Sequence, residues 1–202
     1  MLSALAPAIH ILPEGSILAR VYYARSLYPQ SWDQFRYFGP LNSRWDHHVP
    51  DVDGNPRAQE RGIYYAAANA KTCLAEVFQV MRRIDRVFQA PWLVMFETQA
   101  QLKLLNLTGD FATRMRASMG IHSGSRGRAR AWARDLYEAY PEIQGALYAA
   151  SMHGGRPAMA LNERALAGPL FPAHPLFHRA LADDVMLNTL KHAASDLGYA
   201  LR

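Results

Sequence analysis

The stretch GIYYAAANAKTCLAEVF, residues 62–78, joins a short apolar run to a helical pattern. The run GIYYAAA at its start has the composition of a short buried strand. Asn69 follows as a suitable N-cap, and apolar positions recur after it at helical spacing. These positions are Cys73, Leu74, Val77, Phe78, Met81, Ile84 and Phe88. The sequence thus predicts a strand that passes directly into a helix spanning residues 69–88.

Around this stretch, strands and helices are mixed without a regular β-α-β-α alternation. Strand composition recurs at residues 17–23, 92–98, 103–108, 146–151 and 157–163, and helices are expected at 125–140 and 180–196. The segment MHGGR, residues 152–156, suits a hairpin connection. We therefore expect a single α+β domain over residues 1–202, with a mainly antiparallel mixed sheet and flanking helices. The glycine-rich motifs of Rossmann and P-loop nucleotide sites do not occur in the sequence.

Residues 26–62 form a long polar and aromatic stretch that contains four prolines. A connection of this length is uncommon inside a compact domain unless it binds something, covers a site or is disordered. Its aromatic residues argue against disorder. We expect it to line a pocket.

Composition limits the class of protein. The chain has 202 residues, 50% of them apolar, and no apolar run approaches the length of a membrane span. Cys73 is the single cysteine, and the first residues lack the pattern of a signal peptide. These features predict a cytoplasmic protein without membrane insertion. Twenty-two Lys and Arg against seventeen Asp and Glu give a net charge of +5, which suits an anionic partner.

Four residues are candidates for a site, two of them because a charged group is costly in an apolar setting. Glu76 lies on the predicted apolar helix, and it is either a carboxylate facing a polar site or a partly exposed residue at the edge of the stripe. Arg20, in the apolar strand 17–23, needs a carboxylate partner or an anionic ligand. Arg44 in the long stretch suits a phosphate, or is simply solvated. Tyr65 ends the strand before Glu76 and is either a pocket or a core residue.

Other polar residues give weaker signals. His47 and His48 are adjacent and have no further ligand at useful spacing, so a zinc site is not predicted, although one of them is expected to donate a hydrogen bond. DVDGN, residues 51–55, is predicted to be a turn, because Gly62 occupies the position where a calcium loop needs glutamate. Ser151 ends a strand without the motif of a hydrolase nucleophile, and a ligand contact through its hydroxyl stays open.

The strongest basic stretch comprises Arg114, Arg116, Arg126, Arg128, Arg130 and Arg134. Residues 126, 130 and 134 share one face of the predicted helix 125–140. This face fits a solvated surface, a nucleic acid, an acidic protein or an internal salt-bridge network equally well.

Taken together, RVYYAR, FGPLNSRWD, GIYYAAANAKTCLAEVF and ALYAAS resemble the RES-domain family in order and spacing over most of the chain. The family pattern is an arginine in an N-terminal strand, an arginine loop, a tyrosine eleven residues ahead of a helical glutamate, and a serine at a late strand end. The resemblance places these at Arg20, Arg44, Tyr65, Glu76 and Ser151. The YY pair leaves Tyr64 as an alternative to Tyr65.

The resemblance implies an ADP-ribosyltransferase-like fold with an NAD+-binding cleft and no metal. It also implies a toxin of a type II toxin-antitoxin pair, with an Xre-like antitoxin. Such a toxin degrades NAD+ by hydrolysis or phosphorolysis, or transfers ADP-ribose to a protein. In this interpretation Glu76, Tyr65 and Ser151 are catalytic, whereas Arg20, Arg44, Tyr65 and His48 bind NAD+. The aromatic segment 32–45 and the arginine face at 126–134 are the expected antitoxin surface. The alternative function is a non-catalytic basic module that binds nucleic acid.

Overall fold

The computed structural model describes residues 2–117 and 120–202, and it contains a large sheet in which most neighbouring strands are antiparallel. The strands are β1 (Ile9–Leu12), β2 (Ile17–Tyr23), β3 (Arg36–Gly39), β4 (Arg57–Ala67), β5 (Arg83–Ile84), β6 (Pro91–Glu97), β7 (Leu102–Asn106), β8 (Gly145–Ala149), β9 (Pro157–Asn162), β10 (Phe177–Ala180) and β11 (Ala200–Leu201). The helices are α1 (Ala70–Val77), α2 (Phe111–Arg114), α3 (Gly120–Ser123), α4 (Arg126–Ala139) and α5 (Leu187–Leu197). The predicted α+β class is confirmed.

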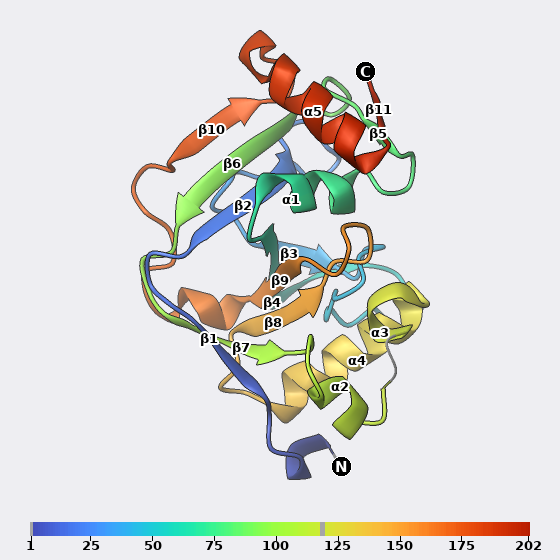
Figure 1. Cartoon of the computed structure of the whole chain (residues 1–202). Coiled ribbons are helices and arrows are strands. Elements are labelled where there is room, and N and C mark those ends of the chain that lie inside the picture. The colour runs from blue at the N-terminus through green and yellow to red at the C-terminus, as the bar shows by residue number, and fades with distance from the viewer. Residues whose placement is uncertain (1, 118–119) are drawn as a thin grey trace.

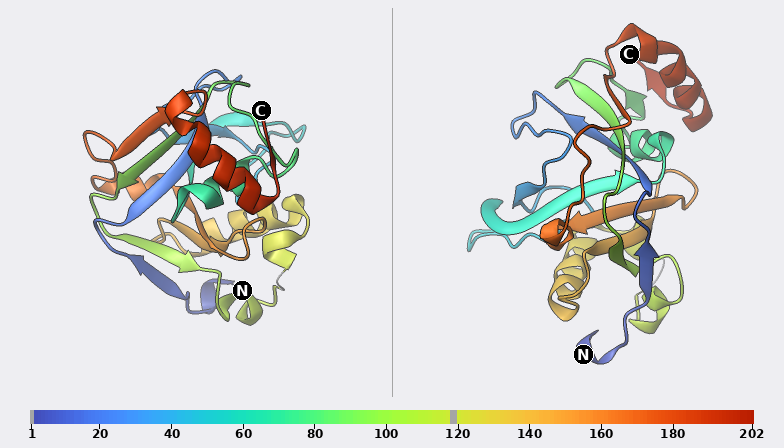
Figure 2. Two further views of the ribbon diagram at one scale, coloured as in Figure 1. Left: turned by 45° about the horizontal axis from the view of Figure 1, so that its top comes forward. Right: turned by 90° about the vertical axis from the view of Figure 1, so that its left-hand side faces the viewer.

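The order of strands divides the large sheet into two groups. Along the described part of the chain the order is β1-β7-β8-β9-β4-β2-β6-β10, with β3 added beside β4 and only β7 and β8 parallel. In Figure 1, strands β2, β6 and β10 lie with α1 and α5 in the upper half, and the other strands lie with α2, α3 and α4 in the lower half. The two further views show the same division (Figure 2).

The two groups meet at one ladder position. Ala19 of β2 pairs with Ala67 of β4, whereas β2 and β6 are in register over seven residues, from Ile17 opposite Glu97 to Tyr23 opposite Pro91. Beyond Ala19, β2 and β4 therefore diverge, and their side chains border a gap instead of a continuous sheet surface. The position of this split decides where the protein has a cavity.

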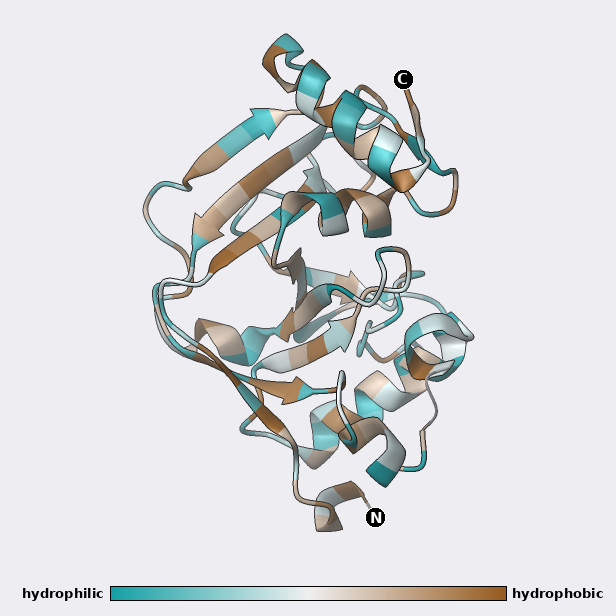
Figure 3. Cartoon of the chain, in the orientation of Figure 1, coloured by the Kyte–Doolittle hydropathy of each residue, from teal (hydrophilic) through white to brown (hydrophobic). Residues whose placement is uncertain are grey.

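Apolar side chains stabilise both halves. One buried cluster joins α2, α3 and α4 to β7 and β8, and another joins α1 and α5 to β6 through residues such as Leu74, Leu93 and Leu190. In Figure 3, brown predominates along β1, β6 and β7, whereas α4 and α5 alternate between teal and brown. The apolar residues of α1, which follows β4 directly, thus pack against β6 and α5.

Helix α1 is shorter than the sequence predicts. Asn69 caps it as expected, because its Oδ1 accepts from the backbone N–H of Thr72 at 2.9 Å. The helix ends at Val77, and Ile84 belongs to β5 while Phe88 is exposed. Arg82 takes a positive φ of 45°, which breaks the helical path. The predicted helix over 69–88 is therefore wrong after Val77, since apolar spacing continued into a turn and a short strand.

The C-terminal helix also starts later than predicted. Residues 177–180 form β10, which pairs with β6, so Ala180, where the predicted helix begins, is the last residue of a strand. Asp183 then caps a short 3₁₀ helix, and α5 begins at Leu187. Gly198 follows in the left-handed region at φ 64°, as its place at the predicted helix end requires.

The long stretch 26–62 is more regular than expected. It contains β3 and the first half of β4. Trp45 and Phe35 are buried, and Trp32 packs on Phe96 with ring centroids 5.8 Å apart. Several aromatic residues of the segment 32–45 therefore supply core contacts, whereas Tyr37 is exposed. In the described residues, no helix is long and apolar enough to cross a membrane.

Gly145 offers a test of the β8–β9 pairing. A Cβ on this residue would lie 2.6 Å from the carbonyl oxygen of Ala160 and 2.8 Å from the Cα of Leu161, so the strands would have to separate. Gly145→Ala should lower the free energy of unfolding by about 1–3 kcal/mol, measured by urea denaturation.

The matched control is Gly127→Ala in α4, where the new Cβ meets only ordinary contacts, the nearest at 3.6 Å. This variant should gain roughly 0.5–1 kcal/mol through helix propensity. Equal stabilities for the two variants would contradict the close strand approach.

Candidate active site

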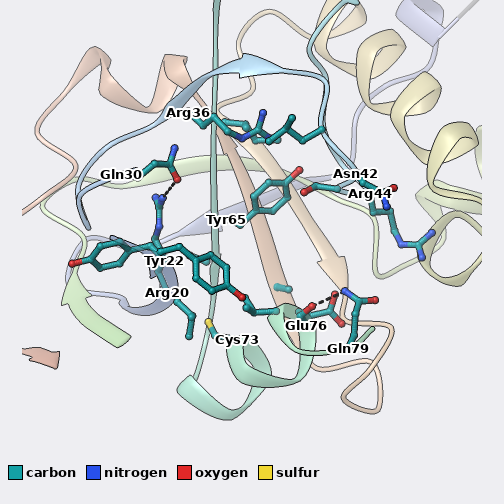
Figure 4. Close-up of a pocket in the computed structure, with 18 of the residues that line it drawn as sticks. Arg20, Tyr22, Gln30, Arg36, Asn42, Arg44, Tyr65, Cys73, Glu76 and Gln79 are labelled. Atoms are coloured by element: carbon teal, nitrogen blue, oxygen red, sulfur yellow. Dashed lines mark hydrogen bonds between the residues drawn. The ribbon is translucent and has the colours of Figure 1, made fainter. Parts of the chain in front are cut away.

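A cavity of about 620 Å³ lies where the sheet divides. Its walls come from β2, β4, α1, the residues after β2 and the loop at 41–44, so the predicted pocket-lining role of the long stretch is confirmed. Figure 4 shows side chains from these segments converging on the same space. The cavity therefore draws together segments that are far apart in the sequence.

Alternation along β4 separates the two tyrosines of the YY pair. Tyr65 lines the cavity, whereas Tyr64 is fully buried on the other face and donates its hydroxyl to the carbonyl of Trp32 at 2.8 Å. Burial raises the pKa of Tyr65 well above its ordinary value, and the Asp46 carboxylate adds to the increase. Tyr65 thus faces the cavity as a neutral phenol that can donate a hydrogen bond.

Arg20 is buried without a carboxylate partner among the described residues. Its guanidinium donates to the carbonyl of Gln34 at 3.0 Å and to Oε1 of Gln30 at 2.7 Å, and it lies 4.0 Å above the ring of Tyr64. These neutral groups accept one N–H from each Nη atom but do not neutralise the charge. The structural ion pair that the sequence left open is not formed, and a cationic residue borders the cavity.

Arg44 lies at the other end of the cavity with a second arginine. One of its Nη atoms donates to the carbonyl of Gly124 at 2.7 Å. Burial and the neighbouring Arg126 lower its pKa, and Glu76 acts in the opposite direction. Arg126 also lines the cavity, although no feature of its sequence context separates it from the other arginines of the basic stretch. Two close guanidinium groups favour an anion between them.

The predicted arginine face on α4 is not a free surface throughout. Arg126 borders the cavity, and Arg130 donates to the carbonyl of Leu41 at 3.3 Å. Arg128 is exposed. The helix therefore helps to hold the loop at 41–44 in place.

Glu76 lies on the cavity side of α1, one turn after Thr72 and Cys73, which line the same space. Its Oε1 accepts a hydrogen bond from the backbone N–H of Met152 at 3.0 Å. It is the single acidic side chain among the described residues that line the cavity. Of the two alternatives, the structure shows a carboxylate that faces a polar site.

Two predicted residues lie outside the described cavity wall. The hydroxyl of Ser151 is 3.5 Å from Oε1 of Glu76, so it contacts the carboxylate from the hairpin between β8 and β9. His48 is fully buried, and its Nδ1 lies 2.5 Å from Oδ1 of Asp46. His48 therefore lies behind the cavity wall. It contacts Asp46 and does not line the cavity.

Asp46 is the residue that the sequence reasoning missed. Its buried carboxylate accepts from Arg36 at 2.7 Å, from the backbone N–H of Leu41 at 2.7 Å and from His48. Burial alone would raise its pKa, but the hydrogen bond from His48 and the charge of Arg36 lower it to about 2. The ionised carboxylate thus anchors the loop that carries Arg44. The sequence feature that could have identified Asp46 is its position directly before His47 and His48, because a carboxylate beside a histidine can accept its N–H.

The remaining polar candidates have structural roles. Asp51 accepts the backbone N–H groups of Asp53 and Asn55 at 3.0 and 2.7 Å, which confirms the predicted turn at 51–55. Cys73 donates to the carbonyl of Ala19 at 3.0 Å, and burial raises its pKa to about 12, so it stays a thiol. Across the described residues, no three His, Cys, Asp or Glu side chains gather in a way that could hold a metal ion.

The sequence matches the family model of the RES domain over residues 17–183, so the chain belongs to the RES domain family. Among solved structures, it is similar to a chain of the M. tuberculosis MbcT-MbcA toxin-antitoxin complex, with a TM-score of 0.55. The two are 13% identical, and the match covers 88% of this chain and 90% of the other, so the likeness is one of fold. No curated protein matches the sequence.

The Asp46 cluster predicts a pH dependence of stability. A carboxyl with a pKa of about 2 in the folded chain and about 3.9 when unfolded stabilises the fold above pH 4 and loses that contribution as pH falls toward 2. Asp46→Asn should therefore cost about 3 kcal/mol at pH 7, and roughly 1 kcal/mol less at pH 3, in urea unfolding.

Asp53→Asn is the matched control, because Asp53 is an exposed residue of the turn at 51–55. It should leave stability unchanged at both pH values. A stability cost for Asp46→Asn that is the same at pH 7 and pH 3 would show that the carboxyl is not ionised in the fold.

Proposed function

We propose that this RES-domain protein consumes NAD+ by breaking its nicotinamide–ribose bond. The observation that carries the proposal is a cavity with one carboxylate, Glu76, and with arginines at both ends that form no ion pair among the described residues. The arginines suit the two phosphates of a dinucleotide. Tyr65 and Tyr22 supply aromatic and hydrogen-bonding surface for a ring.

Glu76 fits the chemistry of this bond. When the bond breaks, its electron pair leaves with the nicotinamide, which becomes neutral, and positive charge develops on the ribose ring. A fixed carboxylate stabilises that charge most where water is excluded. The acceptor then forms the new bond to the ribose carbon, and water as acceptor would release its proton. Because the leaving group departs as a neutral molecule, the step needs no general acid.

The biological role we propose is that of a toxin in a type II toxin-antitoxin pair with an Xre-like antitoxin. Support comes from membership of the RES domain family and from the fold shared with a chain of a toxin-antitoxin complex. The exposed apolar residues Leu27, Tyr28 and Val80 line the cavity and offer a surface that such a partner would cover. They replace the segment 32–45 as the expected antitoxin contact.

Purified protein incubated with NAD+ tests the activity. Nicotinamide release with and without phosphate, and with cell extract, distinguishes water, phosphate and protein as ADP-ribose acceptors. Expression in cells should stop growth and lower NAD+, and co-expression of the neighbouring reading frame should restore both. Unchanged NAD+, together with binding to DNA or RNA that weakens steeply with salt, would support the alternative of a nucleic-acid-binding module.

Glu76→Gln keeps the shape of the side chain and removes its charge. Nicotinamide release should fall by about a hundredfold or more, because one preorganised electrostatic group at the developing charge is lost. Glu142→Gln, at an exposed position, should retain wild-type turnover. Thermal unfolding confirms that both variants are folded. Wild-type activity of Glu76→Gln would contradict a catalytic role for Glu76.

Arg44→Lys tests the anion site at the second end of the cavity. An ammonium cannot reproduce the paired N–H donors of a guanidinium, so the KM for NAD+ should rise about tenfold or more. The exposed Arg128→Lys on α4 is the control and should leave KM unchanged. If the two variants have the same KM, Arg44 does not bind the substrate.

A further inference from the structure

The hairpin that connects β8 to β9 touches α1 at two successive turns. The backbone N–H of Met152 donates to Oε1 of Glu76 at 3.0 Å. One residue later, Nδ1 of His153 lies 2.9 Å from Oγ1 of Thr72. Figure 1 shows this hairpin directly beneath the C-terminal half of α1. The lower half of the molecule is thereby joined to the helix that carries Glu76.

Thr72 is a rigid attachment point. Its side chain is fully buried, and Oδ1 of Asn69 accepts both its backbone N–H and its hydroxyl at 2.9 Å. The hydroxyl has one hydrogen, so donation to Asn69 leaves Oγ1 as the acceptor of an N–H from His153. Burial, Arg156 and Lys71 lower the pKa of His153, so at neutral pH the ring is neutral and carries its proton on Nδ1.

The hairpin contacts α1 through Ser151 and Met152 on Glu76 and through His153 on Thr72. Its tip contains Gly154 and Gly155, both exposed and with positive φ values of 56° and 72°. The hydrogen bonds within the turn, from Gly155 to Ala150 and from Arg156 to His153, fix its local shape but not its angle to α1. The contact from His153 to Thr72 therefore restrains the direction in which Met152 points.

We propose that His153 is a positioning residue for the active site. By holding the hairpin on Thr72, it keeps the N–H of Met152 on the carboxylate of Glu76 and fixes the rotamer in which Glu76 faces the cavity. This proposal rests on the proposed function only for its effect on turnover, because the hydrogen bond itself exists without substrate. Neither the basic composition nor the family pattern points to this histidine.

Turnover provides the first test. His153→Ala should lower kcat for nicotinamide release about tenfold, since small misplacement of a reacting group is costly, while KM and Tm stay near wild type. His153→Asn should restore most of kcat, because its amide N–H can occupy the place of Nδ1. Thr72→Val should reproduce the loss, and the double variant should be no worse than either single one. His174→Ala, at an exposed position, is the control.

Amide hydrogen exchange provides a second test that needs no activity. His153→Ala should speed exchange of the Met152 amide about tenfold and leave the amides of β8 unchanged. Unchanged exchange overturns the proposal, as does wild-type kcat in both His153→Ala and Thr72→Val. A fall in Tm with equal kcat loss in the Ala and Asn variants would also overturn it, since the role would then be structural. If wild-type protein does not cleave NAD+, the proposed function fails, and exchange alone decides the positioning role.

Discussion

The single ladder contact between Ala19 and Ala67 is the constraint on which the rest of the site depends. A sheet that continued across β2 and β4 would close the space between them and pair their backbone groups. Because the strands separate after this contact, Arg20 and Tyr65 face a cavity instead of neighbouring strands. Small side chains at both positions allow the close approach of the strands. The Cys73 thiol donates a hydrogen bond to the carbonyl of Ala19 and so attaches α1 at the same point.

The two carboxylates near the cavity differ because their surroundings differ. Asp46 is surrounded by donors, and an arginine and a histidine hold it ionised in a fully buried position. Its charge is used to fix the loop at 41–44. Glu76 receives one backbone N–H and no ion pair from the described residues, so its charge is available to a ligand. The same contrast separates Arg36, which is paired with Asp46, from Arg20, which has only neutral partners.

Much of the site is held by residues that do not face the cavity. His48 supports Asp46, and Asp46 supports the loop of Arg44. In the same way, Asn69 fixes the hydroxyl of Thr72, and Thr72 accepts a hydrogen bond from His153. This bond directs the hairpin that contacts Glu76. The second of these chains connects the upper and lower halves of the split sheet. A ligand bound in the cavity would bridge the same two halves, which is why the site depends on the geometry of the whole fold.

The sequence by itself determined the α+β class, the strand–cap–helix unit around Asn69, the hairpin after β8 and the candidates Arg20, Arg44 and Glu76, because local spacing and the cost of burying charge are visible in one dimension. It left both Tyr64 and Tyr65 open, and only the structure shows that Tyr65 is the one that lines the cavity. Helix ends were not determined: Ile84 continues a helical spacing, yet its pairing with β11 takes it into a strand, and the last helix starts later than predicted because residues up to Ala180 pair with β6. Asp46, Arg126 and the place of His48 came only from tertiary structure. Their roles depend on partners far away in the chain, and no local pattern records which side chains the split of the sheet brings together.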